Sequence, residues 1–421
     1  MSALAQRSLP LKRLKYVVSL RRSRVDGAQD DRPYIGLENI ESSTGRLVVN
    51  PAEVGDAPSS LTAEGESLSN TFEPGDVLFG KLRPYLAKAW VAEFVGRCTM
   101  ELLVMEPAEA DSRFLRYICL SRDFIDAVDS STFGSKMPRA DWNFIGNMSI
   151  PVPELARQRA IADYLDRETA RIDALIAAKE RLLGLLAEKR RALITRAVTR
   201  GLDPHAPLRD SGIPWLGQIP AHWEIERSRW LFRERDERSV TGDEELLTVS
   251  HLTGVTPRSE KDVNMFEAET TEGYKICRAG DLVINTLWAW MGAMGISPVD
   301  GIVSPAYNVY QPGPKLEPGF VDVLVRMPIF AEEVTRYSKG VWSSRLRLYP
   351  EGFFEVFFPV PQLAEQRAVV AHIAEETAER DALHSATEHT IVLLKERRAA
   401  LIAAAVTGQL NVCSARNGER R

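Results

Sequence analysis

The chain repeats itself, and this repetition constrains its fold more than any other feature. Residues 151–175 read PVPELARQRAIADYLDRETARIDAL, and residues 359–383 read PVPQLAEQRAVVAHIAEETAERDAL. The offset of 208 residues (359 − 151) holds without a gap as far as Leu202 and Leu410. Upstream, FEPGDVLFGKLRPYL from residue 72 matches CRAGDLVINTLWAWM from residue 277 more weakly, at an offset of 205. Self-similarity at a fixed offset predicts two equivalent structural units.

The two halves agree unevenly along their length. In each half, a divergent segment comes first and a better-preserved segment follows. A preserved segment performs the same task twice. A divergent segment either tolerates drift or performs two different tasks, and the sequence leaves both interpretations open.

The preserved segments carry the pattern of long amphipathic helices. Residues 154–203 contain no proline, and apolar side chains recur at steps of three, four and seven over residues 161–194. The second copy repeats this stripe over residues 373–406, where Arg380 and Thr387 interrupt it. A helix of about 45 residues extends roughly 65–70 Å and needs a partner helix to bury its apolar face. We expect the two copies to pair in an antiparallel arrangement; the alternative is an ordinary helical hairpin inside one core.

The divergent segments predict mixed α and β structure. GDVLFGKL and GDLVINTL each begin with a Gly-Asp turn signal and continue into a β-favouring run. FLRYICLSRDFIDAVDS and FVDVLVRMPIFAEEVTRYS predict short amphipathic helices. The expected fold class is therefore α+β, with two mixed domains separated by two long antiparallel coiled-coil helices in a pseudo-twofold tandem repeat.

Domain boundaries follow from the repeat and from the prolines that precede each helix. The linker between the halves is rich in Pro and Gly, but Trp215, Leu216 and Trp223 are too apolar for a free tether. We expect a first globular domain at 1–153, a first helical region at 154–200, an ordered linker at 201–222, a second globular domain at 223–361, a second helical region at 362–410 and a disordered tail at 411–421.

Composition narrows the class of protein. The net charge of −5 argues against an indiscriminate DNA-coating protein, although specific DNA binding depends on local basic faces rather than on the total. The four cysteines, Cys98, Cys119, Cys277 and Cys413, form no CxxC pair and predict reduced thiols. The histidines are dispersed and predict no metal site. The N-terminus has no apolar signal core and no stretch reaches the length of a membrane span, so we expect a cytoplasmic protein.

Several motifs together resemble the specificity subunits of Type I restriction–modification systems. They are PVPELARQRAIADYLD and PVPQLAEQRAVVAHI, the helix ends KRRALITRAVT and ERRAALIAAAVTGQL, and the linker DSGIPWLGQIPAHWE. The resemblance covers nearly the whole chain, in the family's order. It departs from the family at Arg157, where the second copy has the usual acidic residue, Glu365.

The resemblance implies a division of labour. Each divergent half becomes a target-recognition domain for double-stranded DNA, and the paired helices space these domains and hold two methyltransferase subunits. S-adenosylmethionine, ATP and Mg²⁺ are then expected on partner subunits, with a separate ATP-driven restriction subunit cutting the DNA. This chain itself is expected to hold no cofactor and no metal.

Missing catalytic motifs favour the same interpretation. The chain has no GxxxxGK[ST] phosphate loop and no Asn-Pro-Pro-aromatic or Asp-Pro-Pro-aromatic motif. Asp76 and Glu101 form an imaginable metal pair in the first half, but their counterparts Asp281 and Ala306 do not preserve it. Turn capping is therefore the better interpretation of the two aspartates. We expect a non-catalytic subunit.

Candidate DNA-binding residues lie in loops after the expected strands, where basic and aromatic side chains recur at equivalent repeat positions. They are Lys81, Arg83, Tyr85, Lys88, Lys136, Arg139, Trp142, Trp288, Trp290, Ser343, Ser344, Arg345 and Arg347. For each residue alone, a solvated charge or a core aromatic is an equally good interpretation. The loops differ between halves, KLRPYL against TLWAWM and GSKMPR against GVWSSR, which predicts an asymmetric target with two different half-sites.

The helix starts supply candidates for the methyltransferase interface: Gln158, Arg159, Gln366 and Arg367. Capping and intrahelical pairing are the alternative roles for these residues. At the level of the whole chain, the competing hypotheses are a coiled-coil adaptor without DNA specificity and a self-sufficient nuclease or methylase. A neighbouring gene for an adenine methyltransferase distinguishes the DNA-reading subunit from the adaptor.

Overall fold

The computed structural model describes residues 9–27, 30–48, 68–260, 270–340, 346–410 and 412. The chain forms two compact units, Met1–Glu180 with Glu388–Arg421 and Arg181–Thr387. Ser343, Ser344, Arg345 and Cys413, which were singled out from the sequence, lie outside the described residues.

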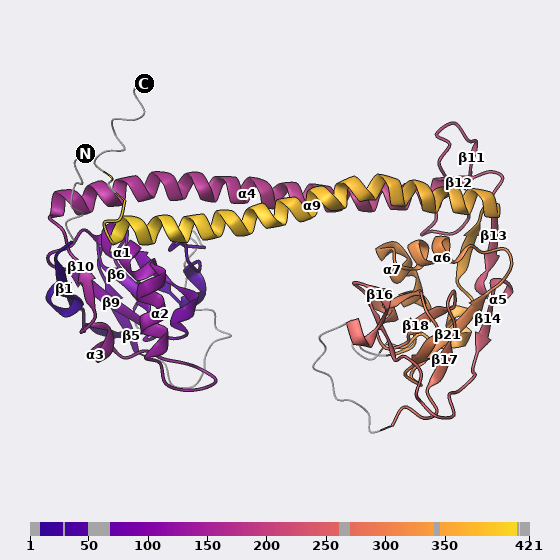
Figure 1. Ribbon diagram of the computed structural model, residues 1–421, viewed down its shortest axis with the longest axis horizontal. Helices are drawn as coiled ribbons and strands as arrows, with labels where there is room; N and C mark the ends of the chain where they lie inside the picture. The colour runs from indigo at the N-terminus through magenta and orange to yellow at the C-terminus, as the bar shows by residue number, and fades with distance from the viewer. Residues whose placement is uncertain are drawn as a thin grey trace, which may run out of the picture. The chain divides into compact units, whose positions relative to one another are not determined.

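Two long helices contribute to both units. Helix α4 spans Leu155–Arg200 and helix α9 spans Leu363–Val406. Each begins shortly after a Pro-Val-Pro segment, because proline lacks the backbone N–H that a helix interior requires. In unit 1 the start of α4 packs against the end of α9, with Leu165 and Val406 in one core. In unit 2 the end of α4 packs against the start of α9, with Val198 and Val369 in one core. The two helices are therefore antiparallel within each unit, and lie side by side there (Figure 1).

The globular part of unit 1 is built from short strands and three α-helices. Its strands are β1 Leu11–Arg13, β2 Val18–Leu20, β3 Arg24–Asp26, β4 Tyr34–Ile35, β5 Leu68–Phe72, β6 Val77–Gly80, β7 Ala89–Val91, β8 Gly96–Cys98, β9 Leu102–Pro107 and β10 Ser149–Pro151. Its helices are α1 Ser112–Leu120, α2 Arg122–Ser130 and α3 Trp142–Ile145, with 3₁₀ turns η1 Leu14–Tyr16, η2 Leu37–Asn39 and η5 Pro84–Leu86.

The globular part of unit 2 repeats this plan. Its strands are β11 Leu208–Asp210, β12 Gln218–Pro220, β13 Glu224–Arg227, β14 Phe232–Arg235, β15 Leu247–Ser250, β16 Gly254–Pro257, β17 Lys275–Cys277, β18 Leu282–Asn285, β19 Met294–Ile296, β20 Gly301–Val303, β21 Tyr307–Pro312 and β22 Phe357–Val360. Its helices are α5 Ser228–Leu231, α6 Pro318–Val325, α7 Pro328–Tyr337 and α8 Pro350–Phe353, with 3₁₀ turns η6 Arg258–Glu260 and η7 Ala289–Met291.

Equivalent antiparallel sheets form the centre of each unit. Their strand orders are β2-β9-β6-β7 and β14-β21-β18-β19. Both faces of the first sheet are buried: Val77 and Phe79 point into a core with α1 and α2, whereas Leu78 points into a second core with Trp90 and Val104. This alternation is the two-residue period of a strand. The predicted α+β fold class, with mixed domains and two long helices, is confirmed.

A capped turn leads into the central strand of each sheet. Asp76 accepts a hydrogen bond from the backbone N–H of Glu73 at 2.8 Å and binds Arg21 at 2.7 Å. Asp281 accepts the equivalent turn bond at 2.9 Å and binds Arg235 at 2.8 Å. The predicted turn-capping role of both aspartates is confirmed. Their carboxylates also hold the arginine of a neighbouring segment, which the sequence pattern did not indicate.

The linker between the halves is packed against unit 2. Trp215 and Trp223 are buried in its main core. The indole N–H of Trp223 donates to Glu365 Oε1 at 3.0 Å, and His222 Nε2 lies 3.0 Å from the other carboxylate oxygen. Glu365 is thus a linker anchor near the start of α9. Arg157, its counterpart in the first copy, carries the opposite charge, so the same bonds cannot form there.

Candidate nucleic-acid interface

Two loops of unit 1 that carry predicted DNA-binding residues lie side by side. One follows β6 and the other connects α2 to α3. The backbone N–H of Arg83 donates to Pro138 O at 2.7 Å, and that of Ala140 donates to Lys81 O at 2.9 Å. These bonds join segments that are more than fifty residues apart in the sequence. The structure therefore brings the two predicted groups of the first half together.

The most accessible predicted residues of this loop pair are Arg83, Tyr85 and Lys136. Arg83 is exposed and has a positive φ of 51°, which turns the chain sharply before η5. Tyr85 is 52% exposed, and Lys136 is exposed on the neighbouring loop. Basic and aromatic side chains next to each other suit contact with phosphates and bases. Lys81 is half-buried beside them.

Other predicted residues of the first half already have partners within the chain. Arg139 Nη2 lies 3.0 Å from Glu101 Oε1. Lys88 Nζ donates to Leu37 O at 2.6 Å, and burial lowers its pKa from the ordinary lysine value. Trp142, at the start of α3, packs against the main core of unit 1. The carboxylate of Glu101 largely neutralises the charge of Arg139. Glu101 thus acts as an ion-pair partner rather than as a metal ligand.

One of the backbone bonds that join the unit 1 loop pair recurs in unit 2. Leu348 N donates to Thr286 O at 3.2 Å, as Ala140 N donates to Lys81 O in unit 1. The corresponding residue differences are 208 (348 − 140) and 205 (286 − 81), which are the two offsets of the sequence repeat. Lys339 and Arg347 exchange backbone hydrogen bonds at 2.9 and 3.0 Å within the second of these loops. The two loop pairs therefore occupy equivalent positions and share one joining backbone bond.

The side chains on the second loop pair differ from those on the first. Trp288 and Trp290 are stacked, with ring centroids 6.3 Å apart and an interplanar angle of 16°. Trp288 is 50% exposed, whereas Trp290 is half-buried and donates its indole N–H to Leu287 O. Arg347 is exposed on the neighbouring loop. An aromatic stack replaces the Arg-Pro-Tyr turn of unit 1, so the two units present different chemistry on one scaffold.

Gln158 does not lie on an accessible surface. Its side chain is 1% exposed, and its Oε1 accepts the backbone N–H of Asp111 at 2.9 Å. Its Nε2 donates to Pro153 O at 2.8 Å. The side chain thus fastens the start of α4 to the residue that caps α1. These bonds support the alternative role, capping at the helix start, and the methyltransferase-interface role of Gln158 stays an untested prediction.

Gln366 makes the same bonds in unit 2 and is fully buried. It accepts from the backbone N–H of Glu317 at 2.8 Å and donates to Pro361 O at 2.8 Å. The two glutamines are internal latches because all of their polar atoms have partners inside the chain. Arg159 and Arg367 differ, with side chains 64% and 68% exposed. Of the four candidates for a partner interface, only these two arginines are accessible.

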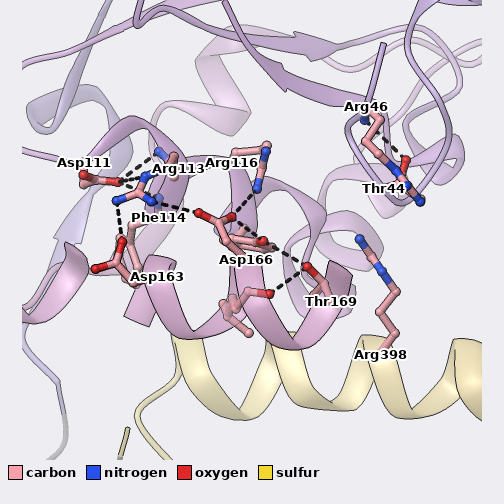
Figure 2. A network of polar contacts seen from close by, with 12 residues as sticks. Thr44, Arg46, Asp111, Arg113, Phe114, Arg116, Asp163, Asp166, Thr169 and Arg398 are labelled. Atoms are coloured by element: carbon pink, nitrogen blue, oxygen red, sulfur yellow. Dashed lines mark hydrogen bonds and ion pairs between the residues drawn. The ribbon is translucent and has the colours of Figure 1, made fainter. Parts of the chain in front are cut away.

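Sequence reasoning missed a polar network that joins α1 to α4 (Figure 2). Arg113 lies between Asp163 and Asp166, with N–O distances of 2.9 and 2.8 Å. Arg116 also binds Asp166, at 3.0 Å, and the hydroxyl of Tyr117 donates to the same carboxylate at 2.7 Å. The apolar patterns predicted both helices, but not that the helices face each other.

The equivalent junction in unit 2 lacks the charged side chains that form this network in unit 1. Gly319 occupies the position of Arg113 (an offset of 206), and a Cβ added there would lie 3.3 Å from Val370 of α9. Ala371 and Ala374 replace the two aspartates of α4 at the 208-residue offset. The cluster around Arg113 thus has no charged counterpart at the same positions of unit 2, where an ion pair between Arg367 and Glu317, 2.9 Å long, joins α9 to the start of α6.

Within the described residues, no group of three or more His, Cys, Asp or Glu side chains could hold a metal ion. No helix in the same part of the chain is both long enough and apolar enough to cross a membrane. Cys98, Cys119 and Cys277 are free and buried, as predicted.

The sequence has three curated relatives of one kind. The specificity subunit of the Type I restriction enzyme EcoBI of Escherichia coli is 21% identical over 364 residues, which cover 80% of this chain and 74% of the relative. That of EcoDI, also of Escherichia coli, is 24% identical over 142 residues, and that of MjaVIII of Methanocaldococcus jannaschii is 28% identical over 128 residues. These two matches cover 34% and 30% of this chain, but only 30% and 28% of the relatives. No family model matches the chain.

Solved structures show the same fold. A chain from a study of complex assembly and conformational transition of the Type I restriction–modification system superposes with a TM-score of 0.72 at 19% identity, covering 96% of this chain and 99% of that one. The HsdS subunit from Thermoanaerobacter tengcongensis superposes with a TM-score of 0.51 at 19% identity, covering 96% and 98%. The fold and the loop pairs define a tandem two-domain protein built on two shared helices. The resemblance predicted from the sequence, to the specificity subunits of Type I restriction–modification systems, is confirmed.

Proposed function

We propose that this chain is the DNA sequence-recognition subunit of a Type I restriction–modification complex. It binds a bipartite, asymmetric target in double-stranded DNA, with each globular domain reading one half-site. The observation that carries this proposal is the loop pair that recurs at equivalent positions of each unit, joined by one equivalent backbone bond and furnished with different side chains. A common scaffold with different base-contacting groups is what an asymmetric reader requires, because bases are distinguished by side chains at their edges.

The chemistry belongs, in this proposal, to other subunits of the complex in the cytoplasm. Two methyltransferase subunits carry S-adenosylmethionine, and restriction subunits carry ATP and Mg²⁺. This chain supplies recognition and a scaffold, and it transfers no methyl group and cuts no DNA by itself.

Reconstitution with a methyltransferase subunit of a Type I system tests the proposal. The complex is incubated with a randomised duplex library, and the methylated adenines are located by sequencing. We expect an asymmetric split consensus. Arg83→Ala alters only one half-site and Arg347→Ala only the other. A lost base contact weakens the affected half-site by about 1–3 kcal/mol. A palindromic consensus contradicts the division of labour, and methylation without any sequence preference favours the adaptor hypothesis.

A further inference from the structure

Two large aromatic side chains outside the loop pairs are strongly exposed. Tyr16, at the end of η1, is 65% exposed, and Trp230, in α5, is 77% exposed. Neither belongs to the DNA-binding candidates. An exposed tryptophan costs free energy in water and marks an interaction surface when its surroundings support one.

The two aromatics occupy equivalent positions in the two units. Just before Tyr16, the backbone N–H of Leu14 donates to Met148 O at 2.9 Å. Just before Trp230, the backbone N–H of Ser228 donates to Val356 O at 2.8 Å. The two donor residues are 214 positions apart in the sequence (228 − 14), and so are the two aromatic residues (230 − 16). The two acceptor residues are 208 positions apart (356 − 148), as in the main repeat. The same frame therefore presents an aromatic ring at the same place in both units.

The neighbours of the rings are also equivalent. Lys15 Nζ lies 5.3 Å from the centroid of the Tyr16 ring, and Arg13 donates to the side-chain oxygen of Asn147 at 3.4 Å. We name these four residues the Tyr16 surface.

In unit 2, Arg227 Nη1 lies 2.9 Å from Glu355 Oε2, and Arg229 binds the other oxygen of the same carboxylate. Glu355 stands where unit 1 has Asn147, at the offset of 208. We name Arg227, Arg229, Trp230 and Glu355 the Trp230 surface.

The pattern of preservation indicates a common partner. The recognition loops differ between the units, whereas these surfaces keep an aromatic ring, an adjacent basic side chain and an arginine bound to a polar partner. A feature held constant while the base-reading loops change fits a partner that is the same in both units. Such a partner is present in two copies, one for each unit.

The charge of the Trp230 surface favours a protein over a nucleic-acid backbone. Glu355 lies between the two arginines and offsets their charge, which weakens attraction to phosphate. Tryptophan, tyrosine and arginine are instead the residues that dominate the binding energy of protein interfaces.

We propose that the Tyr16 surface and the Trp230 surface each dock one copy of the same protein partner. Each aromatic ring enters an apolar pocket on that partner, and an acidic side chain at the pocket rim meets Lys15 in unit 1. Resting on the proposed function, this partner is the methyltransferase subunit. The inference assigns its two docking sites to the globular parts of this chain.

Native mass spectrometry of the full chain, mixed with the methyltransferase subunit that reconstitutes its methylation activity, tests the inference. The wild-type chain is expected to bind two copies. Tyr16→Ala and Trp230→Ala are each expected to weaken one of the two binding events by at least about tenfold, since truncation of an interface hot spot has at least this effect. The double variant weakens both. Tyr85→Ala and Trp288→Ala are matched controls: they remove exposed aromatics of the recognition loops, so they keep two copies and change only DNA preference.

The outcomes separate this inference from the proposed function. If both variants and the double variant bind two copies with wild-type affinity while DNA recognition is intact, the docking sites lie elsewhere and the inference is overturned. If the wild-type chain recognises no DNA sequence and binds no methyltransferase, the proposed function itself fails. A photoreactive benzoylphenylalanine in place of Trp230 is expected to cross-link to the methyltransferase. Cross-linking to DNA instead overturns the choice of partner. Unchanged circular dichroism melting verifies that the alanine variants fold.

Discussion

Arg398 of α9 binds Asp173 of α4 with an N–O distance of 2.9 Å, and both side chains are only 9% exposed. The same guanidinium donates to the carbonyl oxygen of Ser43 at 2.7 Å. The repeat places a second pair in unit 2, where Arg190 lies 3.4 Å from Asp381. Both residues of this pair are displaced by 208 from their counterparts (398 − 190 and 381 − 173), but their side chains are 48% and 55% exposed. Equivalent ion pairs thus join the two helices in each unit, buried in the first and exposed in the second.

This contrast predicts unequal contributions to stability. Arg398→Met leaves the buried Asp173 with the more exposed Arg46, 3.1 Å away, as its remaining ion-pair partner, and is expected to lower the free energy of unfolding by about 2 kcal/mol. Arg190→Met breaks an exposed pair and is expected to cost less than about 1 kcal/mol. Urea unfolding followed by circular dichroism measures both, and equal losses contradict the difference in burial.

Replacement of Gln158 or Gln366 is expected to reduce local protection from amide hydrogen exchange. Gln158→Ala removes the acceptor of the Asp111 N–H, and Gln366→Ala removes that of the Glu317 N–H. A buried donor without a partner costs about 1–3 kcal/mol. We expect faster amide hydrogen exchange around α1 in the first variant and around α6 in the second. Exchange that rises equally in both units for either variant argues against two independent latches.

The side chain of Arg83 can be removed without disturbing the backbone of the loop that carries it. Its φ of 51° is in the left-handed region, which glycine adopts readily. Arg83→Gly is therefore expected to keep the melting temperature and to weaken methylation at one half-site only. Arg83→Lys, which retains a cation, serves as the matched control in the same methylation assay. Loss of both half-sites in the glycine variant would mean that this loop holds the assembly together.

Buried thiols predict a decline of stability at alkaline pH. Burial raises the pKa of Cys277 to about 12 and also raises the pKa values of Cys98 and Cys119. The thiols ionise more readily in the unfolded chain, so their contribution to stability is complete below about pH 9 and is lost as the pH rises through the folded-state pKa. The free energy of unfolding should fall less steeply over pH 9–12 in Cys277→Ala than in the wild-type chain. A pH series of urea titrations provides the comparison.

Much of the architecture could be predicted because it depends on local patterns. The helix limits follow from proline-free apolar stripes, and the Gly-Asp turns before β6 and β18 follow from side chains that bond to their own backbone. Thr387, which interrupts the apolar stripe, is nonetheless buried, because its hydroxyl donates to Leu383 O one turn back. Arg380 likewise reaches back to Glu376 on its own helix. The polar interruptions are thus satisfied within one helix.

The candidate sites were less predictable, since accessibility depends on partners distant in the sequence. Arg139 and Arg83 are both arginines in the same loop pair. Among the ion pairs of the described residues, however, Glu101 binds Arg139 and not Arg83. Arg345, Ser343 and Ser344 lie outside the described residues, and their DNA contacts stay predictions. A glutamine follows each Pro-Val-Pro segment, and in the structure both glutamines form hydrogen bonds inside the chain. The repeat of a motif in the sequence does not show whether its side chains contact a partner protein or the chain itself.

The sequence by itself determined the tandem repeat, the two long helices, the capped turns and the difference between the two sets of recognition loops. These features rest on spacing within one segment or on comparison of one half with the other. Only the tertiary structure decided which side chains remain accessible. It joined the loops at Lys81 and Ala140, buried Gln158 and Gln366, and left Tyr16 and Trp230 exposed at equivalent positions. The physical reason is that a side chain's exposure and charge environment are set by packing between segments that chain connectivity keeps far apart, and no local pattern specifies those neighbours.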